Sequence, residues 1–99
     1  MTSITPNEAS AESRFPLGLI LITPEADEGL SSEEVDSALA RHSHKDWGDV
    51  GEEEWKKNNR SLRNGSRVFS VYHAGNGSEF WVITEPKRTI TTIILPNER

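Results

Sequence analysis

Residues 67–95, RVFSVYHAGNGSEFWVITEPKRTITTIIL, decide the fold, because apolar and polar residues alternate along much of this stretch. Such alternation is typical of strands that have one buried face. Gly75-Asn76-Gly77 and Pro86-Lys87 are turn sequences that divide the stretch. The sequence therefore predicts a meander of three antiparallel strands, at residues 67–74, 79–85 and 89–95.

A further strand is predicted upstream, in the apolar run FPLGLILIT at residues 15–23. The run is short for a buried helix, and a continuous apolar run is typical of a central strand covered on both faces. Thr23-Pro24 is expected to end it.

A helix is predicted over residues 32–42. Ser31 and Glu34 have the spacing of a capping box, and Leu30 with Val35 has the spacing of a hydrophobic staple. One face of this helix carries four residues at helical spacing: Val35, Ala38, Leu39 and His42.

A second helix is predicted to begin near residues 49–51 and to end at Asn64-Gly65, where glycine supplies a left-handed stop. Asp49 and Glu52 repeat the capping-box spacing. Only two residues form its apolar face, Trp55 and Leu62. We therefore expect this helix to pack at the edge of the core.

The predicted fold class is α+β with the element order β-α-α-β-β-β: an antiparallel meander sheet with two helices packed on one face. Residues 15–99 are expected to form one domain. Residues 1–14 are polar and small, so they are expected to form a flexible N-terminal arm.

The charge balance bears on the class of partner. The chain has 16 acidic and 11 basic residues and a formal net charge of -5. Phosphate recognition needs clustered lysine and arginine, so this balance argues against direct nucleic-acid binding and against an anionic membrane surface. The acidic residues are concentrated in the first two-thirds of the chain.

The chain contains no cysteine, which excludes disulfides, thiolate nucleophiles and cysteine zinc sites. The N-terminal sequence lacks the basic region of a secretory signal, and the longest aliphatic run, Leu19 to Ile22, is far too short to cross a bilayer. A cytoplasmic protein is expected. No phosphate-binding, nucleophile-elbow or zinc-protease motif occurs, and no cofactor is predicted.

Residues 42–54, HSHKDWGDVGEEE, concentrate the reactive side chains. His42 and His44 would point one way on a strand and could then bind zinc, but at the end of a helix they diverge. Because His42 continues the apolar stripe, we favour a partly buried histidine at a helix C-terminus, where its cationic form is stabilised.

The acids of this segment could form a catalytic carboxylate pair or a magnesium site. Capping, the helix dipole and an Asx turn account for most of them, and we favour that structural interpretation. Trp47 either anchors the loop on the core or presents a binding contact, and anchoring is the more frequent role.

A basic and aromatic strand face is a further candidate, because it could bind RNA. Few basic residues occur after residue 63, and acidic residues offset their charge. The residues of this alternative RNA-binding set are Arg63, Arg67, Tyr72, His73 and Arg88.

Residues 38–96 resemble a family of small bacterial proteins that are plasmid- or phage-associated. The resemblance is carried by Arg41-His42, Asp46-Trp47-Gly48-Asp49, Glu52 to Glu54, Asn58, Ser61-Leu62, Gly65, Ser70, Tyr72, Phe80-Trp81-Val82-Ile83-Thr84-Glu85, Thr91-Thr92 and Leu95-Pro96. It implies a mobile genetic element, where small acidic proteins commonly inhibit host defence systems. It implies no catalytic residues.

The chain also resembles ribonuclease toxins of the RelE/ParE type, in two helices followed by a meander, a strand at residues 67–72, and Arg88 near a strand start. Those toxins are usually basic, whereas this chain is acidic.

Three functional hypotheses follow. The first is a non-enzymatic protein-binding protein of a mobile element, such as an inhibitor of the anti-CRISPR or anti-restriction type, that meets a basic surface of a host protein or complex. Its predicted contacts are Asp46, Trp47, Asp49, Glu53 and Glu54. The second is a toxin-like ribonuclease that uses the RNA-binding set. The third is a self-associating structural or regulatory module, such as a homodimer, that pairs through an exposed strand edge.

Overall fold

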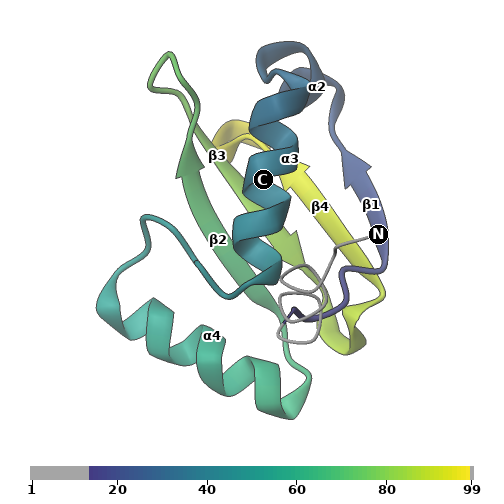
Figure 1. Ribbon diagram of the computed structural model, residues 1–99, viewed down its shortest axis with the longest axis vertical. Coiled ribbons are helices and arrows are strands. Elements are labelled where there is room, and N and C mark those ends of the chain that lie inside the picture. The colour runs from purple at the N-terminus through teal and green to yellow at the C-terminus, as the bar shows by residue number, and fades with distance from the viewer. Residues whose placement is uncertain (1–13, 99) are drawn as a thin grey trace, which may run out of the picture.

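The computed structural model describes residues 14–98, which contain three α-helices and one four-stranded sheet (Figure 1). In chain order the elements are β1 (Leu19–Ile22), α2 (Pro24–Gly29), α3 (Ser32–Ser43), α4 (Glu52–Asn64), β2 (Val68–His73), β3 (Glu79–Thr84), η1 (Pro86–Arg88), β4 (Ile90–Ile94) and η2 (Pro96–Glu98). The predicted arm, residues 1–14, lies outside the described residues except for Arg14. Within residues 14–98, no helix combines the length and hydropathy that a bilayer span requires.

The α+β class is confirmed, but the predicted all-antiparallel sheet is wrong. The strand order is β1-β4-β3-β2, with β2, β3 and β4 antiparallel in succession and β1 parallel to β4. The sheet is mixed because α3 returns the chain to the end where β1 began, so that β2 starts in the direction of β1 (Figure 1). Two antiparallel reversals then leave β4 parallel to β1.

The short helix α2 is absent from the predicted element order. Pro24, expected to end the preceding strand, is instead the first residue of this helix. Thr23 is the N-cap, and its hydroxyl accepts a hydrogen bond from the N–H of Ala26 at 3.3 Å. Proline suits this position, since its missing N–H would have no helical partner there.

Strand β1 lies at an edge of the sheet, so the prediction of a central strand covered on both faces is wrong. It has one neighbour, β4, with Leu19 opposite Ile90. Leu19 is 61% exposed, Ile20 40% and Leu21 44%. An apolar run of this length can serve at an edge as well as in the centre, and composition alone does not separate the two.

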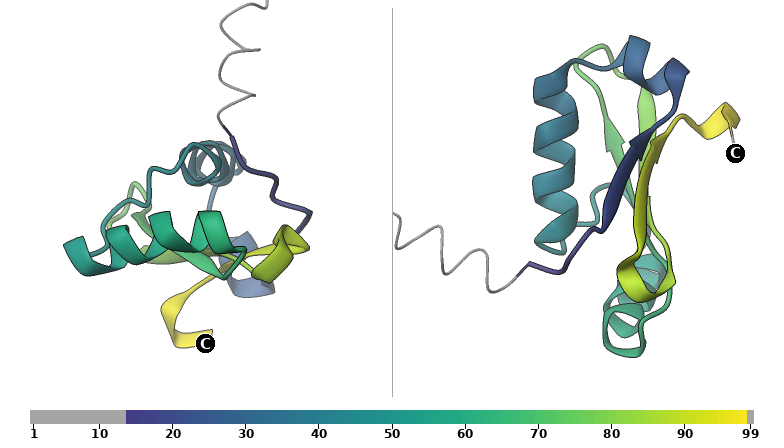
Figure 2. Two further views of the ribbon diagram at one scale, coloured as in Figure 1. Left: turned by 90° about the horizontal axis from the view of Figure 1, so that it is seen from below. Right: turned by 90° about the vertical axis from the view of Figure 1, so that its right-hand side faces the viewer.

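Helix α3 covers one face of the sheet (Figure 2). The predicted capping box at Ser31 and Glu34 is confirmed, and the helix ends one residue beyond the predicted His42. The buried core on this face comprises Ala26, Leu30, Ala38, Tyr72, Ala74, Phe80, Val82 and Ile93.

None of the described α-helices packs on the opposite side of the sheet, although the short 3-10 helix η2 lies on that side, just after β4 (Figure 2). We call this side the open face. Strand alternation and exposure assign to it Leu19, Leu21, Phe69, Trp81, Ile83, Ile90, Thr92 and Ile94, all of which are half-buried or exposed.

Helix α4 lies at the outer edge of β2, so the prediction of two helices on one face is wrong (Figure 1). Its N-cap is Gly51, without a side-chain hydrogen bond, so the predicted capping box at Asp49 and Glu52 is also wrong. Asp49 instead lies beside β2, where its N–H donates to the carbonyl of Val71 at 2.7 Å. The predicted stop at Gly65 is confirmed by its left-handed φ of 79°.

Candidate functional site

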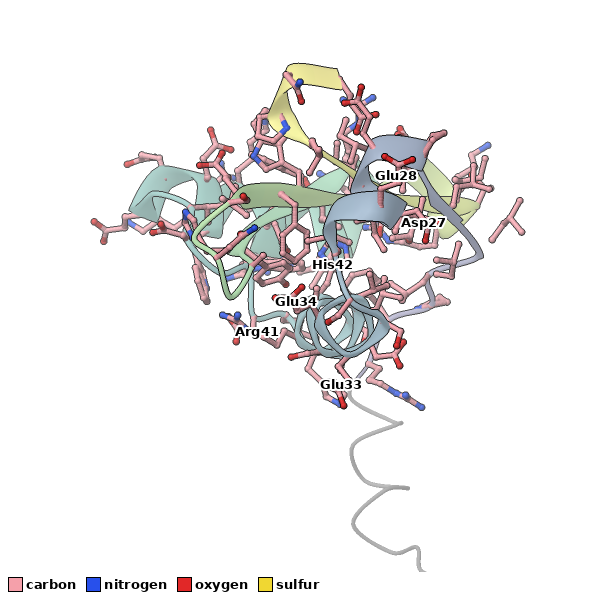
Figure 3. The ribbon with its side chains drawn as sticks, turned by 90° about the horizontal axis from the view of Figure 1, so that it is seen from above. Asp27, Glu28, Glu33, Glu34, Arg41 and His42 are labelled. Carbon is pink, nitrogen blue, oxygen red and sulfur yellow. The ribbon has the colours of Figure 1, made fainter. Side chains whose placement is uncertain are left out.

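His42 lies between α3 and the sheet (Figure 3) and is 0% exposed. Its Nδ1 lies 2.6 Å from the hydroxyl of Ser70, and its Nε2 lies 2.8 Å from the hydroxyl of Thr84. The hydroxyls of Thr84 and Thr91 are 2.7 Å apart, and that of Thr91 donates to the carbonyl of Leu17. The imidazole and hydroxyls thus form a buried hydrogen-bonded chain.

Burial and, to a smaller extent, the charge of Arg88 lower the pKa of His42 to about 3. The prediction of a partly buried, cationic His42 is therefore wrong, since the imidazole is fully buried and neutral near pH 7. His44 points elsewhere, with Nδ1 2.7 Å from the carbonyl of Ala40. Among residues 14–98, no group of three potential metal ligands gathers. The buried imidazole cannot meet a substrate in this arrangement.

Trp47 is 0% exposed, so its predicted role as a binding contact is wrong and its role as a core anchor is confirmed. Its ring centroid lies 5.9 Å from that of Phe15 and 5.5 Å from that of His42. Its Nε1 donates to the side-chain oxygen of Asn59 at 3.1 Å. A buried indole needs such a partner for its N–H.

Asp46 holds the turn that follows α3. Its carboxylate accepts hydrogen bonds from Arg41 Nε at 2.9 Å and from Arg41 Nη2 at 3.3 Å, and also from the N–H of Gly48. The hydrogen bond from Arg41 lowers the pKa of Asp46. The Arg41 guanidinium also lies over the ring of Tyr72, 4.6 Å from its centroid. Asp46 is therefore already engaged in local structure.

The loop after α3 closes the outer edge of β2. Val71 donates to the carbonyl of Trp47 and accepts from the N–H of Asp49, which makes a short parallel bridge with Gly48. Gly48 has a φ of +76°, and a Cβ there would lie 2.1 Å from the Val71 carbonyl oxygen. Only glycine fits this approach.

The other three predicted contacts are exposed. Asp49, Glu53 and Glu54 lie before or within the first turn of α4. The side chain of Asp49 is 75% exposed, with one carboxylate oxygen 3.8 Å from His73 Nδ1. Of the five residues predicted as contacts, these three remain available to a partner.

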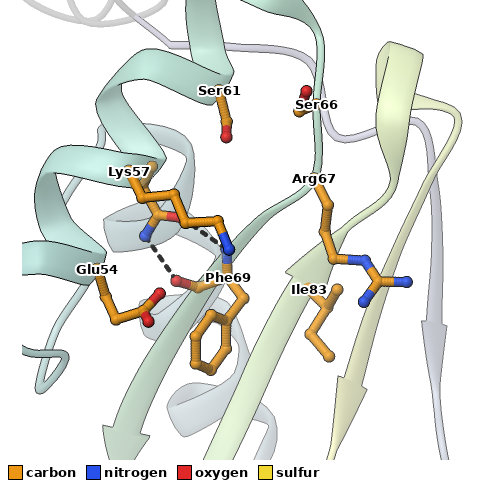
Figure 4. A pocket seen from close by; sticks show the side chains of 8 residues that line it. Glu54, Lys57, Ser61, Ser66, Arg67, Phe69 and Ile83 are labelled. Atoms are coloured by element: carbon orange, nitrogen blue, oxygen red, sulfur yellow. Dashed lines mark hydrogen bonds between the residues drawn. The ribbon is translucent and has the colours of Figure 1, made fainter.

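A cleft of about 410 Å³ lies between α4 and the open face, and Glu54 contributes to it (Figure 4). The residues that line it are Glu54, Lys57, Asn58, Ser61, Ser66, Arg67, Phe69 and Ile83. Phe69 and Ile83 provide its apolar surface, whereas Glu54, Lys57 and Arg67 provide charges of both signs. Arg67 is held by Glu85, with Nε 3.2 Å from the carboxylate.

The structure does not bring the alternative RNA-binding set together as a free surface. Tyr72 is 3% exposed and donates from its hydroxyl to the carbonyl of Asp46 at 2.6 Å, and burial raises its pKa. Arg88 donates to the carbonyls of Ser61 and Ser66, at 2.8 and 2.6 Å. Both residues therefore serve the fold.

The other members of that set are at the surface. Arg63 is exposed near the end of α4, and Arg67 is paired with Glu85 as described above. His73 lies between two carboxylates, those of Asp49 and Glu79, at 3.8 and 3.9 Å. Acidic neighbours of this kind do not favour a polyanion.

No protein-family model, curated protein or solved structure matches the chain.

Proposed function

We propose that this protein is a non-enzymatic binding protein, which holds a basic segment of a partner protein against α4 and the open face of the sheet. The observation that carries the proposal is the uncovered open face, where apolar side chains such as Phe69, Ile83 and Ile94 remain half-buried. Contiguous apolar surface rimmed by polar residues is typical of protein interaction sites.

The charges beside this surface support a basic partner. Asp49, Glu53 and Glu54 are exposed where α4 begins, and Glu54 borders the cleft. Clustered carboxylates accelerate encounter with a positively charged surface and can stand in for nucleic-acid phosphates.

The cleft supports a mixed mode of contact. An apolar side chain of the partner would rest on Phe69 and Ile83, and a neighbouring lysine or arginine would meet Glu54. Lys57 and Arg67 on the same cleft would disfavour a segment that is uniformly basic. The expected ligand is therefore a segment that alternates apolar and basic residues.

The resemblance to plasmid- and phage-associated proteins suggests the setting. We propose that the partner is a host protein or complex with a basic surface, such as one that acts against foreign DNA. The carboxylates of α4 would then occupy a surface that otherwise receives nucleic acid.

The experiment is capture of partners from bacterial lysate on the immobilised full chain, followed by mass spectrometry. The test variant is Glu53→Lys/Glu54→Lys at the start of α4. The control is Glu33→Lys/Asp36→Lys on α3, which changes the net charge by the same amount. We expect the test variant to lose a partner that the control retains. Equal capture by both variants, or equal loss, would contradict the proposal.

A further inference from the structure

The two outer strands of the sheet, β2 and β1, differ in whether other segments hydrogen bond to their outer edge. The edge of β2 is closed by Asn58 of α4 and by the segment of Trp47 and Asp49, which hydrogen bond to its main chain. On the outer side of β1, no described residue makes a comparable contact. Proteins normally protect such edges, because a free edge pairs with other chains.

The main chain of β1 has hydrogen-bonding groups directed outward. The N–H of Leu19 donates to the carbonyl of Thr89, and the N–H of Thr23 donates to the carbonyl of Ile93. Since these groups alternate along a strand, the N–H and carbonyl groups of Ile20 and Ile22 point away from β4. They form a row of donors and acceptors that another strand can meet.

The side chains of β1 do not oppose such pairing. Residues 19–22 are Leu-Ile-Leu-Ile, without charge or proline. Leu19, Ile20 and Leu21 are each at least 40% exposed. Lysine, proline and bulges are the features that usually prevent edge pairing, and this strand has none of them within its four residues.

We propose that β1 pairs antiparallel with β1 of a second copy of this chain, which joins two sheets into one of eight strands. The outward groups fix the register: Ile20 of each copy lies opposite Ile22 of the other, and the two Leu21 residues meet on the two-fold axis. This register satisfies the outward N–H and carbonyl groups of both copies.

Charge complementarity favours a second copy in this antiparallel sense. The acidic helix α2 follows β1 and carries Glu25, Asp27 and Glu28, of which Asp27 and Glu28 are labelled in Figure 3. Basic residues lie at the opposite end of β1, where Gly18 lies against the main chain of Arg88. These residues are Arg14 and Lys87. Antiparallel pairing sets the acidic end of one copy beside the basic end of the other, whereas parallel pairing would align like charges.

The pairing is independent of the proposed partner surface, because α4 lies at the other edge of the sheet. Four residues per copy bury less area than a standard stable interface, so we expect a weak dimer that depends on concentration, with a Kd in the micromolar range.

The primary test is sedimentation of the full chain from about 5 µM to about 500 µM. We expect the monomer to convert to a dimer across this range. Hydrogen exchange should be measured at the lowest and the highest concentration of this range. The amides of Ile20 and Ile22 should be protected only in the concentrated sample. A chain that remains monomeric throughout would overturn the inference.

Two variants locate the interface by different means. Leu21→Lys places two positive charges on the axis, while Ile20→Pro removes an N–H that β4 does not use. Circular dichroism confirms that each variant is folded. Each should weaken the dimer by about tenfold or more, and a dimer that both leave unchanged would overturn the inference.

Charge reversal tests the orientation. Glu25→Lys and Lys87→Glu should each weaken the dimer several-fold, and the double variant should recover affinity. Glu53→Lys on α4 is the control for net charge, and it should not weaken the dimer. Failure of the double variant to recover affinity would overturn the antiparallel arrangement.

Discussion

The carboxamide of Asn58 pairs with the main chain of Phe69 as a neighbouring strand would. Its Nδ2 donates to the Phe69 carbonyl at 2.8 Å, and its Oδ1 accepts from the Phe69 N–H at 3.2 Å. The side chain is 3% exposed, so water cannot readily replace it. One asparagine thus attaches a largely polar helix to the sheet and closes the edge of β2.

We expect Asn58→Ala to lower the free energy of unfolding by about 2 kcal/mol, because two main-chain groups lose their partner in a sheltered site. Urea denaturation measures the change. Arg60→Ala is the control, since it removes an exposed side chain from the same helix. Equal effects of the two substitutions would contradict the role given to Asn58.

Stability should fall as the pH decreases through the range in which His42 titrates when unfolded. The pKa is about 3 in the folded chain against 6.5 ordinarily, so the unfolded state binds the proton more readily. Unfolding free energy should therefore decrease by roughly 2 kcal/mol between about pH 7 and pH 5. Asp46 and Glu34, whose pKa values are lowered from 3.8 and 4.5, contribute a loss only at still lower pH.

The His42→Gln variant tests the origin of this slope. Glutamine cannot be protonated, so the variant should be less stable near neutral pH but nearly insensitive to pH in the same interval. Denaturant melts at several pH values provide the comparison. A slope that persists in His42→Gln would assign the effect to other groups.

Arg88 should hold the last turn of α4 in place. Its guanidinium donates to two carbonyls, those of Ser61 and Ser66, and a lysine cannot reproduce both bonds. We expect Arg88→Lys to cost about 1 kcal/mol and to accelerate amide exchange at the end of α4. Arg63→Lys, on the exposed part of the same turn, should change neither quantity.

Trp47→Ala should destabilise the chain by about 4 kcal/mol, as expected for removal of a large buried side chain. Trp55→Ala is the matched control, because Trp55 is only half-buried on α4. It should lower the free energy of unfolding clearly less than Trp47→Ala does. Thermal or urea denaturation distinguishes them. Equal costs would be inconsistent with enclosure of Trp47 by Phe15 and His42.

Sequence patterns identified most elements because their causes are local. The capping box of Ser31 and Glu34, the left-handed stop at Gly65 and the alternation of β2 and β3 all depend on neighbours in the chain. Helix α2 was missed because Pro24 can either end a strand or begin a helix, and the choice depends on the capping hydroxyl of Thr23.

The position of β1 could not be predicted, and the sequence left two roles open for Trp47, because both features depend on contacts between distant segments. An apolar run fits an edge or a centre equally, and pairing of β1 with β4 alone decides between them. Similarly, an indole in a polar loop is enclosed only because Phe15 and His42 reach it. The hydroxyls that form the buried hydrogen-bonded chain with His42 are only weakly indicated by the sequence. The indication is that Ser70, Thr84 and Thr91 occupy inward positions of their strands.

The central claim, that a partner docks on α4 and the open face, is tested most directly by photo-crosslinking in bacterial cells. Benzoyl-phenylalanine replaces Ile83 in the cleft or, as the control, Ser37 on the exposed side of α3. We predict a crosslinked protein at Ile83 that is absent at Ser37 and disappears with Glu53→Lys/Glu54→Lys. Crosslinks at Ser37 alone, or crosslinks at Ile83 that persist after charge reversal, would contradict the claim.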